Sequence, residues 1–365
     1  MGNEGENQNQ TNAESKEEKP EEKKEEKPLK EEEKKKDEKE KPKKEEKDKK
    51  ETKSQAIKPA VHKEDYEEDV VYLYQFSRTP VIPSLSPFCL KVETWLRMAG
   101  LKYQNVDHKM KLRSKKGQLP FVEFNGQEIA DSALIIKELG KKFNKDLDTD
   151  AGLESTQKCT AHTTIAMIEN HLFWVLYWWR SKNPGQLLKG SKFNLQQALG
   201  SKMPNGLLSF VFKWKFRQGQ KRVRAHGLGV HTSKEIEEFG QSDLQVLSDL
   251  LGEKDFFFGD KPALLDVVAF SVLAQFLFFD KDTPFPLRTW LEENTPNLQA
   301  FVNRMKDRYY PDWDEMCKTL DLNTHLPKPP PEEKEEKEDK DKKEEKKEEK
   351  ADEKEEEKKE EEKKE

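Results

Sequence analysis

Apolar residues follow two different periods within one central block of the chain. Between residues 70 and 145, short runs of strand type alternate with helical patterns. Asn125-Gly126 is a strong hairpin signal, and Gly100 stands where a helix C-terminal glycine is expected. This order predicts a four-stranded α/β unit with one parallel strand pair joined by a crossover helix. The expected strands are 70–76, 103–106, 121–124 and 128–130, and the expected helices are 87–99 and 131–143.

Beyond residue 150 the pattern is helical throughout. Apolar stripes recur at helical spacing around Ile168 and Leu247, and a long apolar run covers residues 267–279. No strand is expected in this half of the block. Residues 185–206 are rich in Gly, Lys and Gln, and we predict that they form a long mobile connection between helices.

The composition sets the boundaries of the folded part. Of the 365 residues, 33% are hydrophobic and 38% are charged, but all Trp, Tyr and Phe side chains lie between Tyr66 and Trp313. Residues 332–365 carry a net charge of −7, and six of their acids have a Lys four positions later while twelve have another acid there, so a disordered segment is favoured over a single stable helix. The expected segments are a disordered Lys/Glu-rich tail at 1–65, an α/β domain at 70–145, an all-α domain at 150–322 and a second disordered tail at 327–365.

Several classes of protein are excluded by simple features. The polar, acidic start of the chain argues against a secretory signal, and no apolar run is long enough to span a bilayer. Cys89, Cys159 and Cys317 are far apart and show no C-x-x-C spacing, which argues against a disulfide framework and against a zinc site. We therefore expect a cytoplasmic protein with no bound metal ion.

Three local motifs carry a resemblance to glutathione transferases. Gln118–Val122 resembles the segment with the cis-proline of thioredoxin-like domains, and Asp131–Ile135 resembles an acid-Ser-x-x-Ile helix start. Gly259–Asp266 is similar to the entry to the buried helix of the transferase C-terminal half, with Ala263 in place of the usual Ser or Thr. The resemblance implies a thioredoxin-like N-terminal domain and an all-α glutathione transferase C-terminal-like domain. It also implies that Asp266 is structural and ties down backbone N–H groups.

A longer match narrows the family. Leu85–Gly100, Thr295–Leu298 and Arg308–Trp313 resemble the failed axon connections family, which is related to the metaxins. This resemblance implies a role in axon development with protein partners in the nervous system, and it leaves dimerisation open. It also implies an alternative localisation, peripheral on the outer mitochondrial membrane or on another membrane face that meets the cytoplasm.

The same resemblance implies a glutathione site. Leu119 and Pro120 would pair with the cysteinyl part of glutathione across a cis Leu119–Pro120 bond. Ser132, with the amides at the helix start after Asp131, would hold the γ-glutamyl carboxylate. Glutathione is the only cofactor that the sequence suggests.

Ser86 and Cys89 are the catalytic candidates. They stand at the first turn of the helix that begins at Pro87, where the redox motif of thioredoxin-like domains lies, and the place of the nucleophilic Cys is taken by Ser86. Ser86 could hydrogen-bond a glutathione thiolate, or Cys89 could be reactive. The alternative for Cys89 is a small buried core residue, because it shares a helical face with Val92 and Leu96.

A long loop weakens the case for catalysis. Residues 77–85 separate the first strand from the helix and are expected to fold over the glutathione pocket. Arg78 in this loop is interpreted either as a contact for an anionic ligand or as a solvated arginine.

One basic, aromatic segment remains. Residues 213–226 hold six Lys or Arg and no acid. This segment is expected to form an amphipathic helix. The helix would pack its apolar face in the core, or contact an anionic membrane, or bind RNA. The net charge of +3 over residues 51–331 argues against nucleic acid. Three hypotheses result: a non-catalytic interaction protein with a residual glutathione cleft, an active glutathione transferase, and a metaxin-like component of the outer mitochondrial surface.

Overall fold

A computed structural model describes residues 61–327. The two predicted tails lie outside the described residues except for their inner ends. The α/β half contains β1 (Val71–Tyr74), α1 (Pro87–Met98), β2 (Tyr103–Asn105), β3 (Phe121–Phe124), β4 (Gln127–Ala130) and α2 (Ser132–Phe143). The helical half contains α3 (Leu147–Asp150), α4 (Ser155–Met167), the π-helical turn η1 (Ile168–Leu172), α5 (Phe173–Lys182), α6 (Pro184–Ser191), α7 (Leu195–Leu199), α8 (Asn205–Arg217), α9 (Gly219–His226), η2 (Leu228–Val230), α10 (Ser233–Leu251), α11 (Leu264–Leu277), α12 (Pro286–Asn294), α13 (Pro296–Tyr309) and α14 (Trp313–Thr319).

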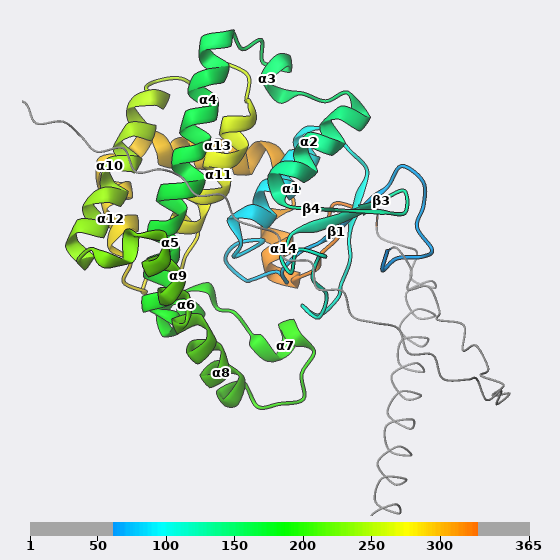
Figure 1. The fold of residues 1–365 in the computed structure, drawn as a ribbon, viewed down its shortest axis with the longest axis horizontal. Coiled ribbons are helices and arrows are strands. Elements are labelled where there is room, and N and C mark those ends of the chain that lie inside the picture. The colour runs from blue at the N-terminus through cyan, green and yellow to red at the C-terminus, as the bar shows by residue number, and fades with distance from the viewer. Residues whose placement is uncertain (1–60, 328–365) are drawn as a thin grey trace, which may run out of the picture. The chain divides into compact units, whose positions relative to one another are not determined.

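The four strands form one sheet in the order β2-β1-β3-β4 (Figure 1). β1 and β2 are parallel, as expected for strands joined by the crossover helix α1, and the other pairs are antiparallel. Asn125 and Gly126 both have positive φ, at 45° and 75°, which is the backbone that a two-residue hairpin turn requires. The predicted elements of this half are therefore confirmed, with ends shifted by one or two residues.

The two faces of the sheet are covered differently. Val71, Leu73 and Val122 point to the face on which α1 and α2 pack. Tyr72 and Phe121 point to the other face, where they pack with Cys89 at the start of α1 and with partly buried side chains from irregular segments. On that face the Glu123 carboxylate accepts hydrogen bonds from the backbone N–H of His62 and Lys63 and from the Tyr74 hydroxyl, at 2.6, 3.0 and 2.7 Å.

The helical half is built around α11. Twelve of its fourteen residues are buried, from Leu265 to Phe276, and α1 packs directly against it. Asp266 lies in the first turn of α11, where its two carboxylate oxygens accept hydrogen bonds from the backbone N–H of Phe257 and Ala263, at 3.0 and 2.8 Å. These bonds are the structural role that the motif implied. Within residues 61–327 no helix combines the length and the apolar character needed to cross a bilayer.

The expectation of a mobile connection at 185–206 is wrong. This stretch contains α6, α7 and the start of α8. One of its glycines serves close packing: a Cβ on Gly190 would lie 2.0 Å from the Phe279 ring. Short helices with glycine at their contacts have little apolar periodicity, and the sequence pattern therefore missed them.

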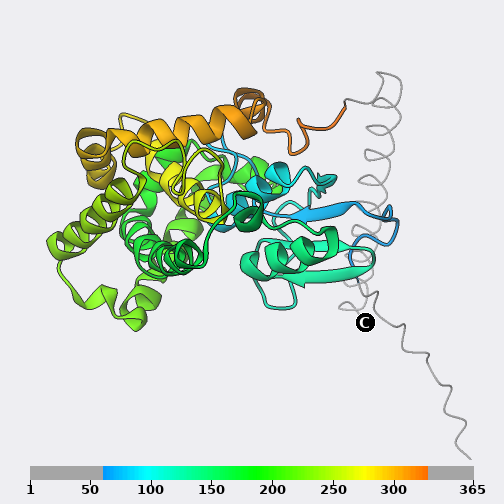
Figure 2. The ribbon, with the colours of Figure 1, turned by 90° about the horizontal axis from the view of Figure 1, so that it is seen from above.

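The last described residues return to the sheet. Figure 2 shows the orange α13 and the segment after it running back over the half that carries the strands. The Asn105 backbone N–H donates to Asn323 Oδ1 at 2.7 Å, and the His325 ring stacks on Tyr103 with centroids 4.0 Å apart. Residues 322–325 therefore cover the open edge of the sheet at β2.

Candidate functional site

Three strand ends meet at one end of the sheet. Tyr74 ends β1, Phe121 begins β3 and Ala130 ends β4, and the register pairs Tyr74 with Phe121 and Phe121 with Ala130. The residues that come next in the chain, Pro120 before β3 and Asp131 after β4, therefore lie at the same end. The predicted ligand-binding residues are thus brought together by the strand order, although they are far apart in sequence.

The Leu119–Pro120 bond is cis, as the sequence motif implied. Just before it, Ser114 and Gln118 close a small loop, in which Ser114 N–H donates to the Gln118 carbonyl and Gln118 N–H donates to Ser114 Oγ, both at 3.2 Å. Within residues 61–327 no hydrogen bond is made by the backbone N–H or C=O of Leu119. Leu119 is 9% exposed, and buried backbone groups without hydrogen-bond partners are rare in folded proteins.

The start of α2 lies beside this segment. Asp131 has φ 91° and caps the helix, and its Oδ1 accepts hydrogen bonds from Ala133 and Leu134 N–H at 3.0 and 3.2 Å. These two amides are therefore occupied, which corrects the expectation that they would be open to a ligand carboxylate. Ser132 is 7% exposed, and neither its N–H nor its hydroxyl has a partner among the described residues.

Ser86 and Cys89 lie at the start of α1. Ser86 is the N-cap, and its Oγ accepts a hydrogen bond from Cys89 N–H at 3.3 Å, which leaves the serine proton available for another acceptor. Cys89 is fully buried against Leu119 and Phe121. Burial raises the pKa of its thiol to about 11, which favours the small buried core residue over a reactive thiol.

Part of the long loop before α1 packs against the helical half. Ile82 is buried in the core of the helical half, and Val81 and Leu85 pack against that core. Arg78 is also buried: its guanidinium pairs with both oxygens of Glu93 on α1, each at 2.6 Å. Both interpretations of Arg78, as a ligand contact and as a solvated side chain, are therefore wrong.

An apolar cavity of about 240 Å³ opens beside Ser86. Its walls come from the loop and first turn of α1, from α5 and from the inner face of α8. Apart from Ser86, its lining includes Phe88, Met110, Phe173, Tyr177, Arg180, Phe193, Phe212 and Phe216.

Arg180 is the unexpected charged group of this cavity. It is 6% exposed, and its guanidinium donates to the Leu85 carbonyl at 2.6 Å and to Gln275 Oε1 at 2.7 Å, with no carboxylate partner among residues 61–327. Burial lowers the pKa of Arg180 to about 9. The only sequence signal is a single arginine at the end of the apolar run Leu172–Trp179, where a core residue would fit the helical pattern.

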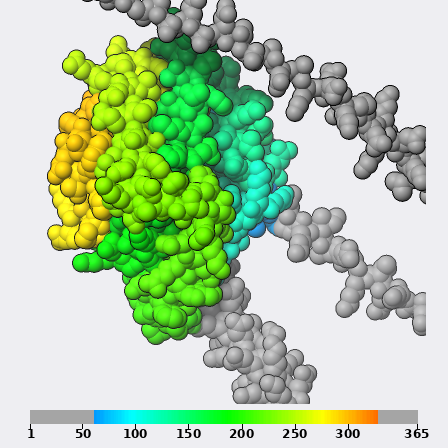
Figure 3. Space-filling model, turned by 60° about the vertical axis from the view of Figure 1, so that its left-hand side comes forward, coloured from blue at the N-terminus to red at the C-terminus, as the bar shows by residue number. Residues whose placement is uncertain are grey.

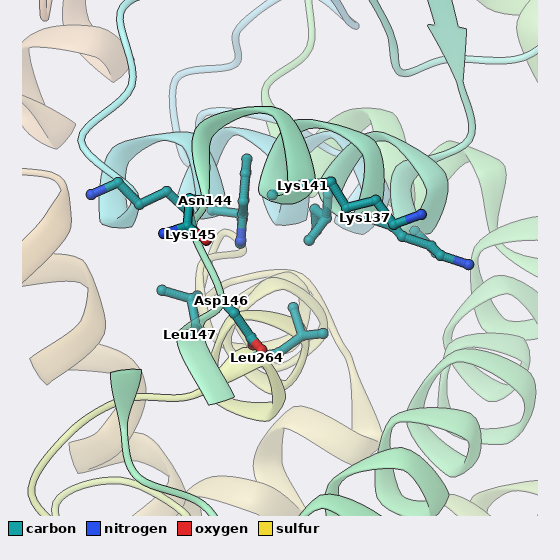
Figure 4. Close-up of a pocket in the computed structure, with 11 residues that line it drawn as sticks. Lys137, Lys141, Asn144, Lys145, Asp146, Leu147 and Leu264 are labelled. Atoms are coloured by element: carbon teal, nitrogen blue, oxygen red, sulfur yellow. The ribbon is translucent and has the colours of Figure 1, made fainter. Parts of the chain in front are cut away.

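A second cavity, of about 440 Å³, lies between α2 and the start of α11. Figure 4 shows Lys137 and Lys141 on one side and Asn144 and Lys145 on the other, with Leu264 opposite. The Lys137 and Lys141 side chains extend away from Leu264, whereas the Asp146 carboxylate lies beside it. The cavity is therefore a crevice between α2 and the start of α11. Among the described residues no group of His, Cys, Asp and Glu is arranged to hold a metal ion.

Comparisons with known proteins agree with this architecture. A model of the glutathione S-transferase N-terminal domain matches residues 87–184, and a model of the glutathione S-transferase C-terminal domain matches residues 240–305. Among solved structures, the beta-etherase LigF from Sphingobium is 16% identical, with a TM-score of 0.44, and the match covers 68% of this chain and 99% of that one.

Curated relatives are more specific. An isoprene-epoxide–glutathione S-transferase from Rhodococcus is 26% identical over 62% of this chain and 94% of its own length, and mouse Metaxin-2 is 24% identical over 68% and 92%. "Failed axon connections" from Drosophila melanogaster is 59% identical over 291 residues, which are 78% of this chain and 69% of the relative. The chain thus has the glutathione transferase fold and belongs to the failed axon connections family, which is related to the metaxins.

Proposed function

We propose that this chain is a glutathione-binding protein of the transferase fold that acts through protein partners in axon development. The binding proposal rests on neighbouring groups that have no hydrogen-bond partner among the described residues. These are the backbone N–H and C=O of Leu119 and the N–H and hydroxyl of Ser132. A γ-glutamyl peptide offers an amide N–H and C=O for Leu119, and a carboxylate for Ser132. Asp131, which is exposed at the same place, would face the ammonium group of that γ-glutamyl unit.

The size of the cavity favours binding over turnover. About 240 Å³ beside Ser86 is less than the roughly 300–1,000 Å³ of common small-molecule sites, and half of its lining residues are aromatic. A bulky second substrate has little room there. The developmental role is proposed from the name and the 59% identity of the Drosophila relative.

Calorimetric titration of the full chain with glutathione tests the binding proposal. We expect a saturable heat, and we expect Ser132→Ala to weaken binding by at least tenfold, because a hydrogen bond to a charged group contributes about 1.5–3 kcal/mol. Ser242→Ala, at an exposed serine of α10, is the matched control and should bind as the parent does. Absence of heat at millimolar glutathione, or equal affinity of Ser132→Ala, would refute the cleft.

The role in development needs a separate test. Drosophila embryos that lack the "Failed axon connections" protein would be supplied with this chain or with its Ser132→Ala variant. Restored axon connections by the parent chain support the proposal, and failure of a well-expressed chain contradicts it. Restoration by the variant as well would separate the developmental role from glutathione.

An active transferase is the second candidate, and Arg180 is the observation that favours it. A buried cation without a carboxylate partner, in the same cavity as Ser86, would stabilise an anion such as a thiolate. Transfer of glutathione to small epoxides, followed by mass spectrometry, tests this candidate. Arg180→Met should abolish product formation if it is correct, and a parent chain that forms no product rules it out for this substrate class.

A further inference from the structure

Helix α8 carries large apolar side chains on its outward face. Leu207, Phe210, Val211 and Trp214 are 50%, 69%, 36% and 59% exposed. At 100° per residue they fall within an arc of about 100°, so they form a single stripe along the helix. The exposed Met203 precedes the stripe in the chain. A contiguous exposed apolar patch often marks an interaction surface, whereas single exposed apolar side chains are common and have no such meaning.

The opposite face of α8 fixes the helix to the fold. Leu208 is buried, and Phe212 and Phe216 line the cavity beside Ser86. Figure 1 places α7 and α8 at the lower end of the helical half, and Figure 3 shows this green region standing out from the rest of the described surface. The exposed stripe is therefore presented on a convex edge and is anchored from behind.

Positive charge surrounds the stripe. Lys213 and Lys215 follow it on its two flanks, and Arg217 closes its C-terminal end. None of these three side chains forms an ion pair with another described residue. Between Asn170 and Lys234 the chain has twelve Lys or Arg and no Asp or Glu, although the whole chain carries a net charge of −6.

We propose that the outward face of α8 binds the surface of an anionic phospholipid bilayer. Aromatic and aliphatic side chains would enter the interface between headgroups and acyl chains, while Lys213, Lys215 and Arg217 would contact the headgroup phosphates. A helix on a convex edge can approach a flat membrane without steric hindrance. Lys and Arg side chains without ion-pair partners among the described residues are attracted by the negative surface potential of an anionic membrane. This inference rests on the outer face of α8, and neither Leu119 nor Ser132 takes part in it.

Other occupants fit less well. A second copy bound through the same face would bring Lys213, Lys215 and Arg217 of both copies together, and like charges in an interface oppose association. The acidic segment 332–365 has the right charge, but its only apolar side chain is that of Ala351, so it cannot cover the aromatic stripe.

Vesicle sedimentation with the full chain tests the proposal. Vesicles of phosphatidylcholine alone are compared with vesicles containing about one third phosphatidylserine, at low and at high salt. We expect binding to the anionic vesicles only, weakened by salt. The double variant Phe210→Ser/Trp214→Ser should bind at least tenfold more weakly, and Lys213→Gln and Lys215→Gln should each reduce binding by roughly fivefold.

Two controls test whether a loss of vesicle binding is specific to the exposed stripe of α8. Both aromatic side chains are more than half exposed, so their replacement leaves the core intact, which circular dichroism verifies. Val246→Ser, at a 50% exposed valine of α10, is the matched control and should bind vesicles as the parent does.

Three results would overturn the proposal. The first is a parent chain that does not sediment with anionic vesicles, and the second is equal binding of the aromatic double variant, which would assign binding to the Lys-rich tails. The third is a dimer in sedimentation equilibrium that the double variant dissociates, in the absence of vesicle binding, because the stripe would then be an interface between two copies.

Discussion

The buried pair of Arg78 and Glu93 joins the long loop to α1, and its removal is the most informative perturbation of the fold. Both side chains are fully buried, and two hydrogen bonds of 2.6 Å connect them. Glu93 also accepts from Gln75 Nε2 at 2.9 Å, and Arg78 also donates to the Leu322 carbonyl at 2.8 Å. The pair thus links the loop, α1 and the segment that returns to β2.

Arg78→Met removes one charge and leaves the other buried without its partner. Such a change costs about 3–5 kcal/mol, because the remaining carboxylate keeps its desolvation penalty and loses its main compensation. For a folded block of this size the loss corresponds to a melting temperature lowered by roughly 10 °C. The double variant Arg78→Met/Glu93→Gln contains neither charge of the pair, and we expect it to recover at least half of the lost stability.

The pH dependence separates this explanation from a simple loss of packing. Burial opposes ionisation of Glu93, but the charge and hydrogen bonds of Arg78 outweigh it and hold the pKa of Glu93 well below its usual range. In the parent chain this contribution is present above the pKa of an unfolded glutamate, and it is lost only as the pH falls toward the low folded value. In Arg78→Met the balance reverses and burial raises the pKa of Glu93. The variant should therefore approach the parent in stability as the pH falls below about 5.

Urea unfolding of the full chain at pH 7 and at about pH 4, followed by circular dichroism, measures both effects. A loss below 1 kcal/mol for Arg78→Met at pH 7 would refute the argument. So would a double variant as unstable as the sum of the two single changes, because the desolvation of an unpaired charge would then not be the dominant cost.

Three further predictions concern the buried Asp266 and the cysteine thiols. Burial raises the pKa of Asp266 to about 7, so stability should fall as the pH rises from 4 through 7, and Asp266→Asn should abolish this dependence in thermal unfolding curves. Asp266→Ala should also cost roughly 2–4 kcal/mol, because the amides of Phe257 and Ala263 lose their acceptor. Iodoacetamide should alkylate the exposed Cys159 readily and the buried Cys89 only on unfolding; mass spectrometry that finds Cys89 modified first would contradict the neutral core thiol.

Local signals predicted the elements of the sheet correctly. The strands, α1 and α2 follow from periodicity, and Asn125-Gly126 fixes the hairpin, since each of these features depends on neighbours in sequence. The cis bond before Pro120 and the role of Asp266 came from family motifs that preserve a local geometry. The short helices α6 and α7 were missed because a glycine packed against Phe279 has the same sequence signature as a mobile one.

Charged residues were interpreted least well, because their partners are distant in sequence. Arg78 finds Glu93 fifteen residues later and Leu322 at the far end of the described chain. Arg180 looks like the polar end of a helix, yet it donates to residues 95 positions away on either side. Nothing within one helical turn of these arginines shows that they are buried, so only the assembled fold assigns their roles.

Helix α8 belongs to both proposed sites, and this sharing leads to a last prediction. Its inner face, with Phe212 and Phe216, forms part of the cavity beside Ser86, and its outer face carries Phe210 and Trp214. A rigid helix cannot shift on one side without shifting on the other, so occupation of the cleft should change the affinity for anionic vesicles. Linkage requires the reciprocal effect, in which vesicles change the affinity for glutathione by the same factor. Sedimentation with and without saturating glutathione, compared with calorimetry with and without vesicles, measures both factors. Unequal fold-changes in the two affinities would contradict a coupling at equilibrium. If neither affinity changes, α8 serves the cavity and the membrane independently.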